Sequence, residues 1–293
     1  MSPVQPVPHL VLGPDGPWDA VLADFVRHGV ALAYGSMAHW ESRLPDEAEQ
    51  RRLLGRDWDL YRARPGRRGR NQFVVTRSLL KYLAAQAVGA EPSDLELGYA
   101  LTGRLYVRGC DQVDLNLSHT GDLMLVGMTS LGVIGVDVEP LDRALYGRST
   151  ERQMCTRDEL ELLHATAEED RNLRLVRQWT LKEAYTKALG LGLHFSFTEF
   201  GFQVDEDPPL LRRADGTPAG GDAWSFRSLR VGDGHVAGIA LHNGGLGRTG
   251  DTRMTTTLDA GTLGAVRRAL RVAADRRAVE DDSRTGPGTA LNL

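Results

Sequence analysis

Three short segments of β character follow one another in the middle of the chain, and they restrict the fold more than any other feature. They cover residues 114–117, 123–129 and 132–139, and Pro140 ends the third. Only the dipeptide at 130–131 separates the last two, so we expect a β-hairpin there. A hairpin excludes an all-parallel sheet. Together with helical segments on both sides, it favours an α+β fold.

The first half of the chain contains one strong helix signal. Apolar residues recur at helical spacing over residues 72–88, and Gly89 is a suitable stop. A shorter helix is expected from Pro45 onward. Between them lies the arginine-rich stretch RARPGRRGR at residues 62–70, and its Pro-Gly pair predicts a loop.

The second half begins with two predicted helices. Thr156 is a suitable N-cap because Glu159 follows three residues later, which completes a capping box. The next helix runs from about residue 171 to residue 189 and stops at Gly190. Strand-like segments follow at residues 199–204, 223–229 and 235–241.

The composition limits the classes of function. A net charge of -4 gives no overall bias toward nucleic acid, whose binders are commonly basic. Cys110 and Cys155 lie far apart without metal-site spacing, which favours a reducing, cytoplasmic location. The first residues show no basic region followed by an apolar run, and no stretch approaches the ~18 apolar residues that a membrane span needs, so we expect neither secretion nor membrane insertion. We therefore expect neither nucleic acid nor a membrane as a partner.

Two segments carry acidic residues in patterns that suggest a site. In the strand GVIGVDVEP, alternation places Asp137 and Glu139 on one face, although the solvated side of a half-buried strand gives the same pattern. In the helix RQWTLKEAYTKALG, Glu183 and Lys187 are neighbours one turn apart. The alternative there is an ordinary solvent-exposed ion pair. Lysine is rare in this chain, with 3 among 35 basic residues, and Lys182 lies in the same helix.

A third segment offers hydrogen-bond donors. In DLNLSHTGD, Ser118 and His119 lie between a short strand and a glycine turn. A histidine near neutral pH can donate to a phosphate, but a single loop histidine is more often simply exposed.

In order and spacing, the three segments resemble the surfactin-type (Sfp-type) 4'-phosphopantetheinyl transferases. The matching motifs are NLSHTGD at 116–122, GVDVE at 135–139 and WTLKEAYTKALG at 179–190. The resemblance runs from about residue 70 to residue 202. It implies an enzyme that moves the 4'-phosphopantetheine arm of coenzyme A to a serine of an apo acyl or peptidyl carrier protein and releases 3',5'-ADP.

The resemblance also implies an architecture. Two similar α+β halves form a pseudo-dimer, and we place them at residues 1–130 and 131–243, the second with the metal and phosphate site. Residues 244–293 would be a linker and a C-terminal extension, with one possible helix at 263–279. The family further implies a monomer.

The implied metal site holds Mg2+ on Asp137, Glu139 and Glu183. Magnesium prefers hard oxygen ligands, and three clustered carboxylates would repel one another without a cation. The proton of the attacking serine would go to Glu183 or to a metal-bound water, and the sequence leaves that choice open. His119 and Lys187 would contact the phosphates of the coenzyme.

Further coenzyme contacts implied by the resemblance are Ser118, Lys182, Arg104 and Arg70. Arg104 stands where the family has a lysine within a Gly-Lys-Pro turn. Gln72 stands where the family commonly has an arginine that binds the 3'-phosphate, so Arg70, or Arg67 or Arg68 beside it, would have to replace that group.

Two alternatives remain at this point. One is a different reaction on the same scaffold, such as hydrolysis of the coenzyme pyrophosphate or transfer to a small acceptor. The other is a non-catalytic module that binds coenzyme A or a carrier protein. The intact set of acids and Lys187 argues against the second.

Overall fold

The structure, a computed structural model, describes residues 6–191 and 195–244. Up to residue 129 it contains a four-stranded sheet, a small hairpin and a group of helices, confirming mixed α and β structure. The elements of this part are β1 (His9–Leu10), α1 (Asp19–His28), β2 (Val30–Ser36), α2 (Met37–Glu41), α3 (Glu47–Leu54), η1 (Gly55–Asp57), α4 (Trp58–Ala63), α5 (Gly66–Val88), η2 (Pro92–Asp94), β3 (Leu97–Tyr99), β4 (Leu105–Val107), β5 (Asp114–Thr120) and β6 (Leu123–Thr129).

The described residues after 129 contain a three-stranded sheet, a second small hairpin, three α-helices and one 3-10 helix. Its elements are β7 (Gly132–Pro140), α6 (Thr150–Met154), α7 (Arg157–Ala165), α8 (Glu168–Ala188), η4 (Phe197–Glu199), β8 (Phe200–Gln203), β9 (Leu210–Arg213), β10 (Trp224–Val231) and β11 (His235–Asn243). The predicted helix at 263–279 lies outside the described residues.

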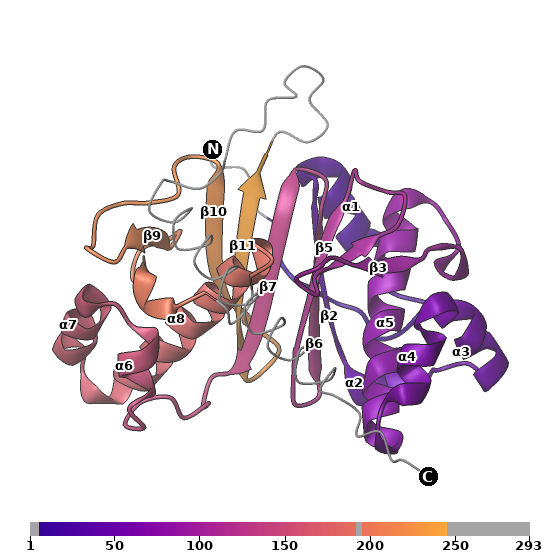
Figure 1. The fold of residues 1–293 in the computed structure, drawn as a ribbon, viewed down its shortest axis with the longest axis horizontal. Coiled ribbons are helices and arrows are strands. Elements are labelled where there is room, and N and C mark those ends of the chain that lie inside the picture. The colour runs from indigo at the N-terminus through magenta and orange to yellow at the C-terminus, as the bar shows by residue number, and fades with distance from the viewer. Residues whose placement is uncertain (1–5, 192–194, 245–293) are drawn as a thin grey trace, which may run out of the picture.

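The two main sheets stand side by side in the middle of the molecule, with helices on both outer sides (Figure 1). The first sheet has the strand order β1-β2-β6-β5 and the second has the order β10-β11-β7. Helix α5 lies against the first sheet, and α8 lies along β7 and β11 of the second. The order of layers is therefore helix, sheet, sheet, helix.

Three apolar cores hold these layers together. One lies between the first sheet and α5, and another between the second sheet and α8. The third lies between the sheets and includes Leu32, Leu125, Val136 and Ile239. Because burial of apolar surface is the main favourable contribution to folding, this third core fixes the sheets against each other.

The predicted hairpin between β6 and β7 is wrong. β6 pairs with β5 and β2, whereas β7 pairs with β11 in the other sheet. The residues that connect β6 to β7 are hydrogen-bonded to the residue before β2 and do not form a hairpin turn. The amide of Ser130 and the hydroxyl of Thr129 both donate to the carbonyl of Gly29. The dipeptide Ser130–Leu131 thus passes the chain from one sheet to the next. The hairpin is formed instead by β5 and β6 around Gly121.

The helices predicted within the described residues are present, and except for the one capped by Thr156 their starts differ by two or more residues from those expected. The capping box of Thr156 and Glu159 is confirmed, and α5 ends at Gly89 in the left-handed conformation at a φ of 70°. The stretch predicted as a loop is non-helical only at residues 64–65, and the rest of it belongs to α4 and to α5, which starts at Gly66. Pro65 precedes the first helical residue, a position at which proline's missing N–H costs little.

Among the described residues, no helix is long and apolar enough to cross a membrane.

Candidate active site

Strand β7 supplies two of the predicted acids. Its alternation places Val136 and Val138 in the core between the sheets, and sends Asp137 and Glu139 to the other face. That face is covered by α8, so the alternative of a solvated strand face is wrong. Asp137 is only 4% exposed.

Helix α8 presents a row of three residues toward this strand. Trp179, Glu183 and Lys187 are each four positions apart and therefore lie on one side of the helix. The helix approaches the strand closely because Gly135 has no side chain. A Cβ atom at that position would overlap the carbonyl oxygen of Ala184.

Lys187 pairs with Asp137 and not with Glu183, which excludes the alternative of a solvent-exposed Glu-Lys pair. Its Nζ lies 2.6 Å from Oδ1 of Asp137 and 3.0 Å from Oγ of Ser118. It also donates to the carbonyl of Val136 at 3.3 Å. Ser118 in turn donates to the same Asp137 oxygen at 2.8 Å, so β5, β7 and α8 meet at one carboxylate.

Glu139 is held by a different cation. The guanidinium of Arg143 donates to its carboxylate and lies 4.6 Å above the ring of Trp179. Burial, followed by the charge of Asp137, raises the pKa of Glu139, whereas Arg143 and a hydrogen bond from Trp179 act in the opposite direction. The Thr120 hydroxyl lies 3.4 Å from the other carboxylate oxygen.

Glu183 is close enough to both ion pairs for the charges of all four partners to act on it. It is 8% exposed. Burial is the main cause that raises its pKa to about 7, and the charges of Asp137 and Glu139 add to it, against the opposing charge of Lys187. A carboxyl group with a pKa near neutrality can both hold and release a proton under physiological conditions.

A metal ion would find suitable oxygen atoms here, although the side chains are not arranged as a finished site. Within residues 6–191 and 195–244, no three His, Cys, Asp or Glu side chains form a ready-made metal-binding group. However, Oδ2 of Asp137 is buried without a hydrogen-bond partner in the same part of the chain. The charge of Asp137 also raises the pKa of both Glu139 and Glu183. An unsatisfied carboxylate oxygen among mutually repelling acids fits a hard divalent cation.

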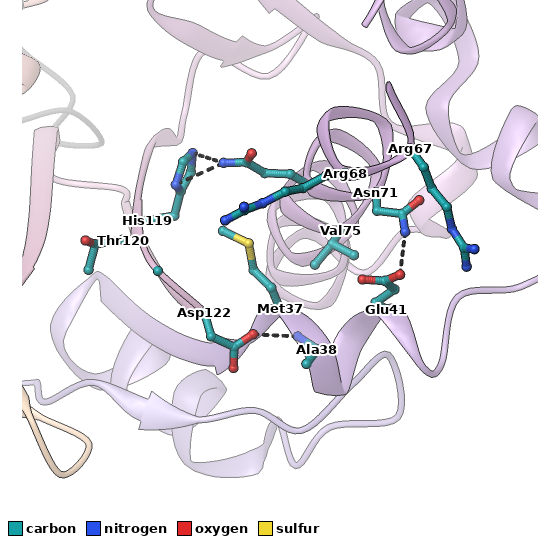
Figure 2. Close-up of a pocket in the computed structure, with 12 residues that line it drawn as sticks. Met37, Ala38, Glu41, Arg67, Arg68, Asn71, Val75, His119, Thr120 and Asp122 are labelled. Carbon is teal, nitrogen blue, oxygen red and sulfur yellow. Dashed lines mark hydrogen bonds between the residues drawn. The ribbon is translucent and has the colours of Figure 1, made fainter. Parts of the chain in front are cut away.

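A cavity of about 810 Å³ opens beside Thr120 at the end of β5. It is bounded by α2, the start of α5 and the β5–β6 turn (Figure 2). Two guanidinium groups, Arg67 and Arg68, belong to its lining, as does His119. In Figure 2 the Arg68 side chain extends from α5 over the cavity toward the side where His119 lies. These groups suit a large anionic ligand.

Gln72 lies within this cavity and contacts the predicted histidine. Its amide nitrogen is 3.0 Å from Nε2 of His119. Burial and the charges of Lys187 and Arg77 lower the pKa of His119, so its ring is neutral at pH 7. A neutral imidazole still offers one N–H donor to a phosphate.

Lys182 was predicted as a coenzyme contact, and the structure contradicts this. Its side chain is completely buried and points away from Asp137. Its ammonium is 2.6 Å from Oε2 of Glu159 and also donates to the carbonyls of Met154, Phe197 and Phe200. All its donors are used inside the protein, so this lysine joins α8 to its neighbours.

Arg104 and Arg70 also differ from the prediction. Arg104 is an internal ion-pair partner of Asp114, with its side chain 13% exposed. Arg70 is not part of the cavity lining, and it donates to the carbonyl of Arg64 at 3.4 Å. Arg67 and Arg68, one turn earlier, line the cavity instead.

The sequence reasoning missed two residues at the site. Trp179 lies one helical turn before Glu183, and that spacing was a signal that could have included it. Arg143 lies four residues after Glu139 in the loop after β7, where helical spacing does not apply. A local turn, in which the amide of Arg143 donates to the carbonyl of Pro140, brings the two side chains together.

Comparison with known proteins gives a consistent result. Residues 133–240 match the model of the 4'-phosphopantetheinyl transferase superfamily. A phosphopantetheinyl transferase of Thraustochytrium sp. is 29% identical over 189 residues, which are 59% of this chain and 65% of that protein. The 4'-phosphopantetheinyl transferase HetI of Nostoc sp. is 30% identical over 59% of this chain and 71% of its own length.

A fungal relative extends the match. The 4'-phosphopantetheinyl transferase pptA of Paxillus involutus is 36% identical over 208 residues, 64% of this chain and 75% of that protein. The chain thus spans just under two thirds of the first of these relatives and somewhat more of the other two. On this similarity and on the residues gathered between β7 and α8, the chain belongs to the 4'-phosphopantetheinyl transferase superfamily.

Proposed function

We propose that this protein is an Sfp-type enzyme that transfers the 4'-phosphopantetheine moiety of coenzyme A to a serine of an apo acyl or peptidyl carrier protein, with release of 3',5'-ADP. Membership of the superfamily supports this proposal, as do the names of the relatives. The observation that carries it is the meeting of Asp137, Glu139 and Glu183 beside Lys187, with an arginine-lined cavity next to them.

Mg2+ is the proposed metal, with Asp137, Glu139 and Glu183 as its ligands. The unpartnered Oδ2 of Asp137 and the mutual repulsion of the acids support this set. When bound there, the ion would neutralise the charge of the pyrophosphate at which the reaction takes place. The ligands come from β7 and α8, which the Gly135 contact holds close together.

Coenzyme A is proposed to occupy the cavity beside β5. Gln72 stands where the family commonly has the arginine that binds the 3'-phosphate, and Arg67 and Arg68 are suited to take over that contact. His119 donates to a phosphate through its ring N–H. Lys187, which extends toward the acids from α8, is placed to exchange part of its contact with Asp137 for the pyrophosphate.

Glu183 is the proposed acceptor of the proton from the carrier serine. Its pKa of about 7 applies to the protein without metal, and bound Mg2+ would favour the ionised carboxylate, which is the form that accepts a proton. Transfer then depends mainly on holding the serine oxygen in line with the phosphorus and the leaving oxygen, with the base within reach of the hydroxyl proton, and rigid elements on both sides of the site serve that purpose.

We further propose the family's architecture for this chain, with similar halves at residues 1–130 and 131–243 that form a pseudo-dimer. The change from one sheet to the other at residues 130–131 supports this division. A monomer and a cytoplasmic location remain predictions from the sequence.

The test is a mass measurement on an apo carrier protein incubated with the enzyme, coenzyme A and Mg2+. We expect the carrier to gain the mass of one phosphopantetheine group, and Glu183→Gln to abolish the gain. Glu161→Gln is the matched control, because Glu161 is an exposed partner of Arg157 far from the acids.

Each alternative gives its own result in the same mixture. Cleavage of coenzyme A without a gain in carrier mass would indicate hydrolysis or a small acceptor. Binding of coenzyme A without any cleavage would indicate a non-catalytic module. Either result, obtained with several carriers, would refute the proposed transfer.

A further inference from the structure

Arg104 lies in the turn between β3 and β4, yet its guanidinium reaches three other elements. It forms an ion pair with Asp114 of β5, with Nε 3.3 Å from Oδ1. Nη2 donates to the carbonyl of Ile134 on β7 at 2.6 Å. Nη1 donates to the carbonyl of Lys187 in the last turn of α8. One side chain therefore joins both sheets to the end of the helix.

The hydrogen bond from Arg104 stabilises the C-terminal end of α8, where backbone carbonyls need partners from outside the helix. The last four carbonyls of an α-helix have no partner within the helix, and a cation there also interacts favourably with the helix dipole. The amide of Gly190 gives the Lys187 carbonyl one partner at 3.0 Å, and Arg104 gives it a second, charged one. Lys187 is thus fixed through its backbone by Arg104 and through its side chain by Asp137.

We infer that Arg104 is a positioning residue: by fixing the last turn of α8 it holds the Lys187 ammonium against Asp137. This differs from the direct coenzyme contact that the family resemblance implied for Arg104. The guanidinium already donates from all three of its nitrogens. Contact with a phosphate would therefore require it to leave Asp114, which would remain as a buried charge.

The composition of the chain provides a direct test that needs no catalysis. The chain has three lysines, and Lys81 and Lys182 are 2% and 0% exposed, whereas the side chain of Lys187 is 25% exposed. Labelling with an amine-reactive reagent, followed by peptide mass spectrometry, reports each lysine separately. Lys81 and Lys182 then serve as internal monitors of global unfolding.

In the variant Arg104→Met we expect Lys187 to be labelled roughly tenfold faster than in the wild type, because loss of a charge-assisted hydrogen bond favours local opening of the last turn. Lys81 and Lys182 should keep their rates. An unchanged rate at Lys187 would overturn the inference. So would equal acceleration at all three lysines, which would show a merely structural role.

Two further variants complete the design. Arg174→Met is the matched control, since Arg174 is another little-exposed arginine with a carboxylate partner, Asp205 at 2.7 Å, but lies in the first part of α8, so it should leave the Lys187 rate unchanged. If Arg104→Met does not fold, Arg104→Met combined with Asp114→Asn removes the unpaired charge. Arg104→Lys should restore part of the protection.

A kinetic measurement adds a second readout, and it rests on the proposed transfer. We expect Arg104→Met to lower kcat roughly tenfold or more while KM for coenzyme A changes less than about threefold, because displaced catalytic groups lower the rate of the chemical step. A raised KM with unchanged kcat would identify a coenzyme contact and overturn the inference. If the wild type transfers nothing, the proposed function fails, and the labelling rates still decide the role of Arg104.

Discussion

Replacement of Glu183 by glutamine should remove transfer activity and at the same time stabilise the protein without metal. The carboxyl group is buried next to Asp137 and Glu139, and its pKa of about 7 lies well above the ordinary value of 4.5. An ionised Glu183 therefore opposes folding at neutral pH. A neutral amide of the same shape does not carry this cost.

The size of the effect follows from the pKa. One pKa unit corresponds to about 1.4 kcal/mol, so the difference between about 7 and 4.5 amounts to about 3 kcal/mol at high pH. The amide must find hydrogen-bond partners of its own, which reduces the expected gain to about 1–2 kcal/mol. For a chain of this size that is roughly 2–8 °C in Tm.

The raised pKa of Glu183 determines whether stability rises or falls with pH. Below pH 4.5 the carboxyl is protonated in both the folded and unfolded states, so it has no effect there. Between pH 4.5 and about 7 the folded state keeps a proton that the unfolded state loses, so wild-type stability falls as the pH rises. The difference between Glu183→Gln and the wild type should grow over this window and stay constant above it.

The assay is thermal unfolding at pH 5 and pH 8, in the presence of a chelator and again with Mg2+. Mg2+ should raise the Tm of the wild type more than that of Glu183→Gln, because a ligand stabilises only the state that binds it. Glu161→Gln, an exposed change, should follow the wild type throughout. A variant that is less stable than the wild type at pH 8, or a difference independent of pH, would refute the reasoning.

Three other substitutions test separate parts of the structure. Gly135→Ala should destabilise the fold by more than about 2 kcal/mol in urea unfolding and abolish transfer, because the new methyl group overlaps Ala184; wild-type behaviour would contradict the close packing of α8. The double variant Arg67→Ala and Arg68→Ala should raise KM for coenzyme A roughly tenfold with little change in kcat, and an unchanged KM would exclude the cavity as the coenzyme site. Lys182→Met should lower the free energy of unfolding in urea by about 3–5 kcal/mol, because it leaves the buried carboxylate of Glu159 without its cation. Normal stability together with a raised KM for coenzyme A would show that Lys182 is a coenzyme contact after all.

The sequence alone predicted those features that depend on residues within one helix or strand. Alternation along a strand was enough to predict that Asp137 and Glu139 share a face, and helical spacing was enough to predict that Glu183 and Lys187 lie on the same side of α8. The cap at Thr156 and the stop at Gly89 were also predictable, since both depend on neighbouring residues only. The motif order was sufficient to suggest the family.

Tertiary structure decided everything that depends on a contact between distant segments. Lys182 and Lys187 are both lysines of α8, but one points into the core toward Glu159 and the other toward Asp137. The same holds for Arg104, whose partners lie on three elements. Local periodicity fixes the direction of a side chain relative to its own helix or strand, whereas its partner depends on how the sheets and helices pack. That packing determined which cations line the cavity and which belong to the protein's interior.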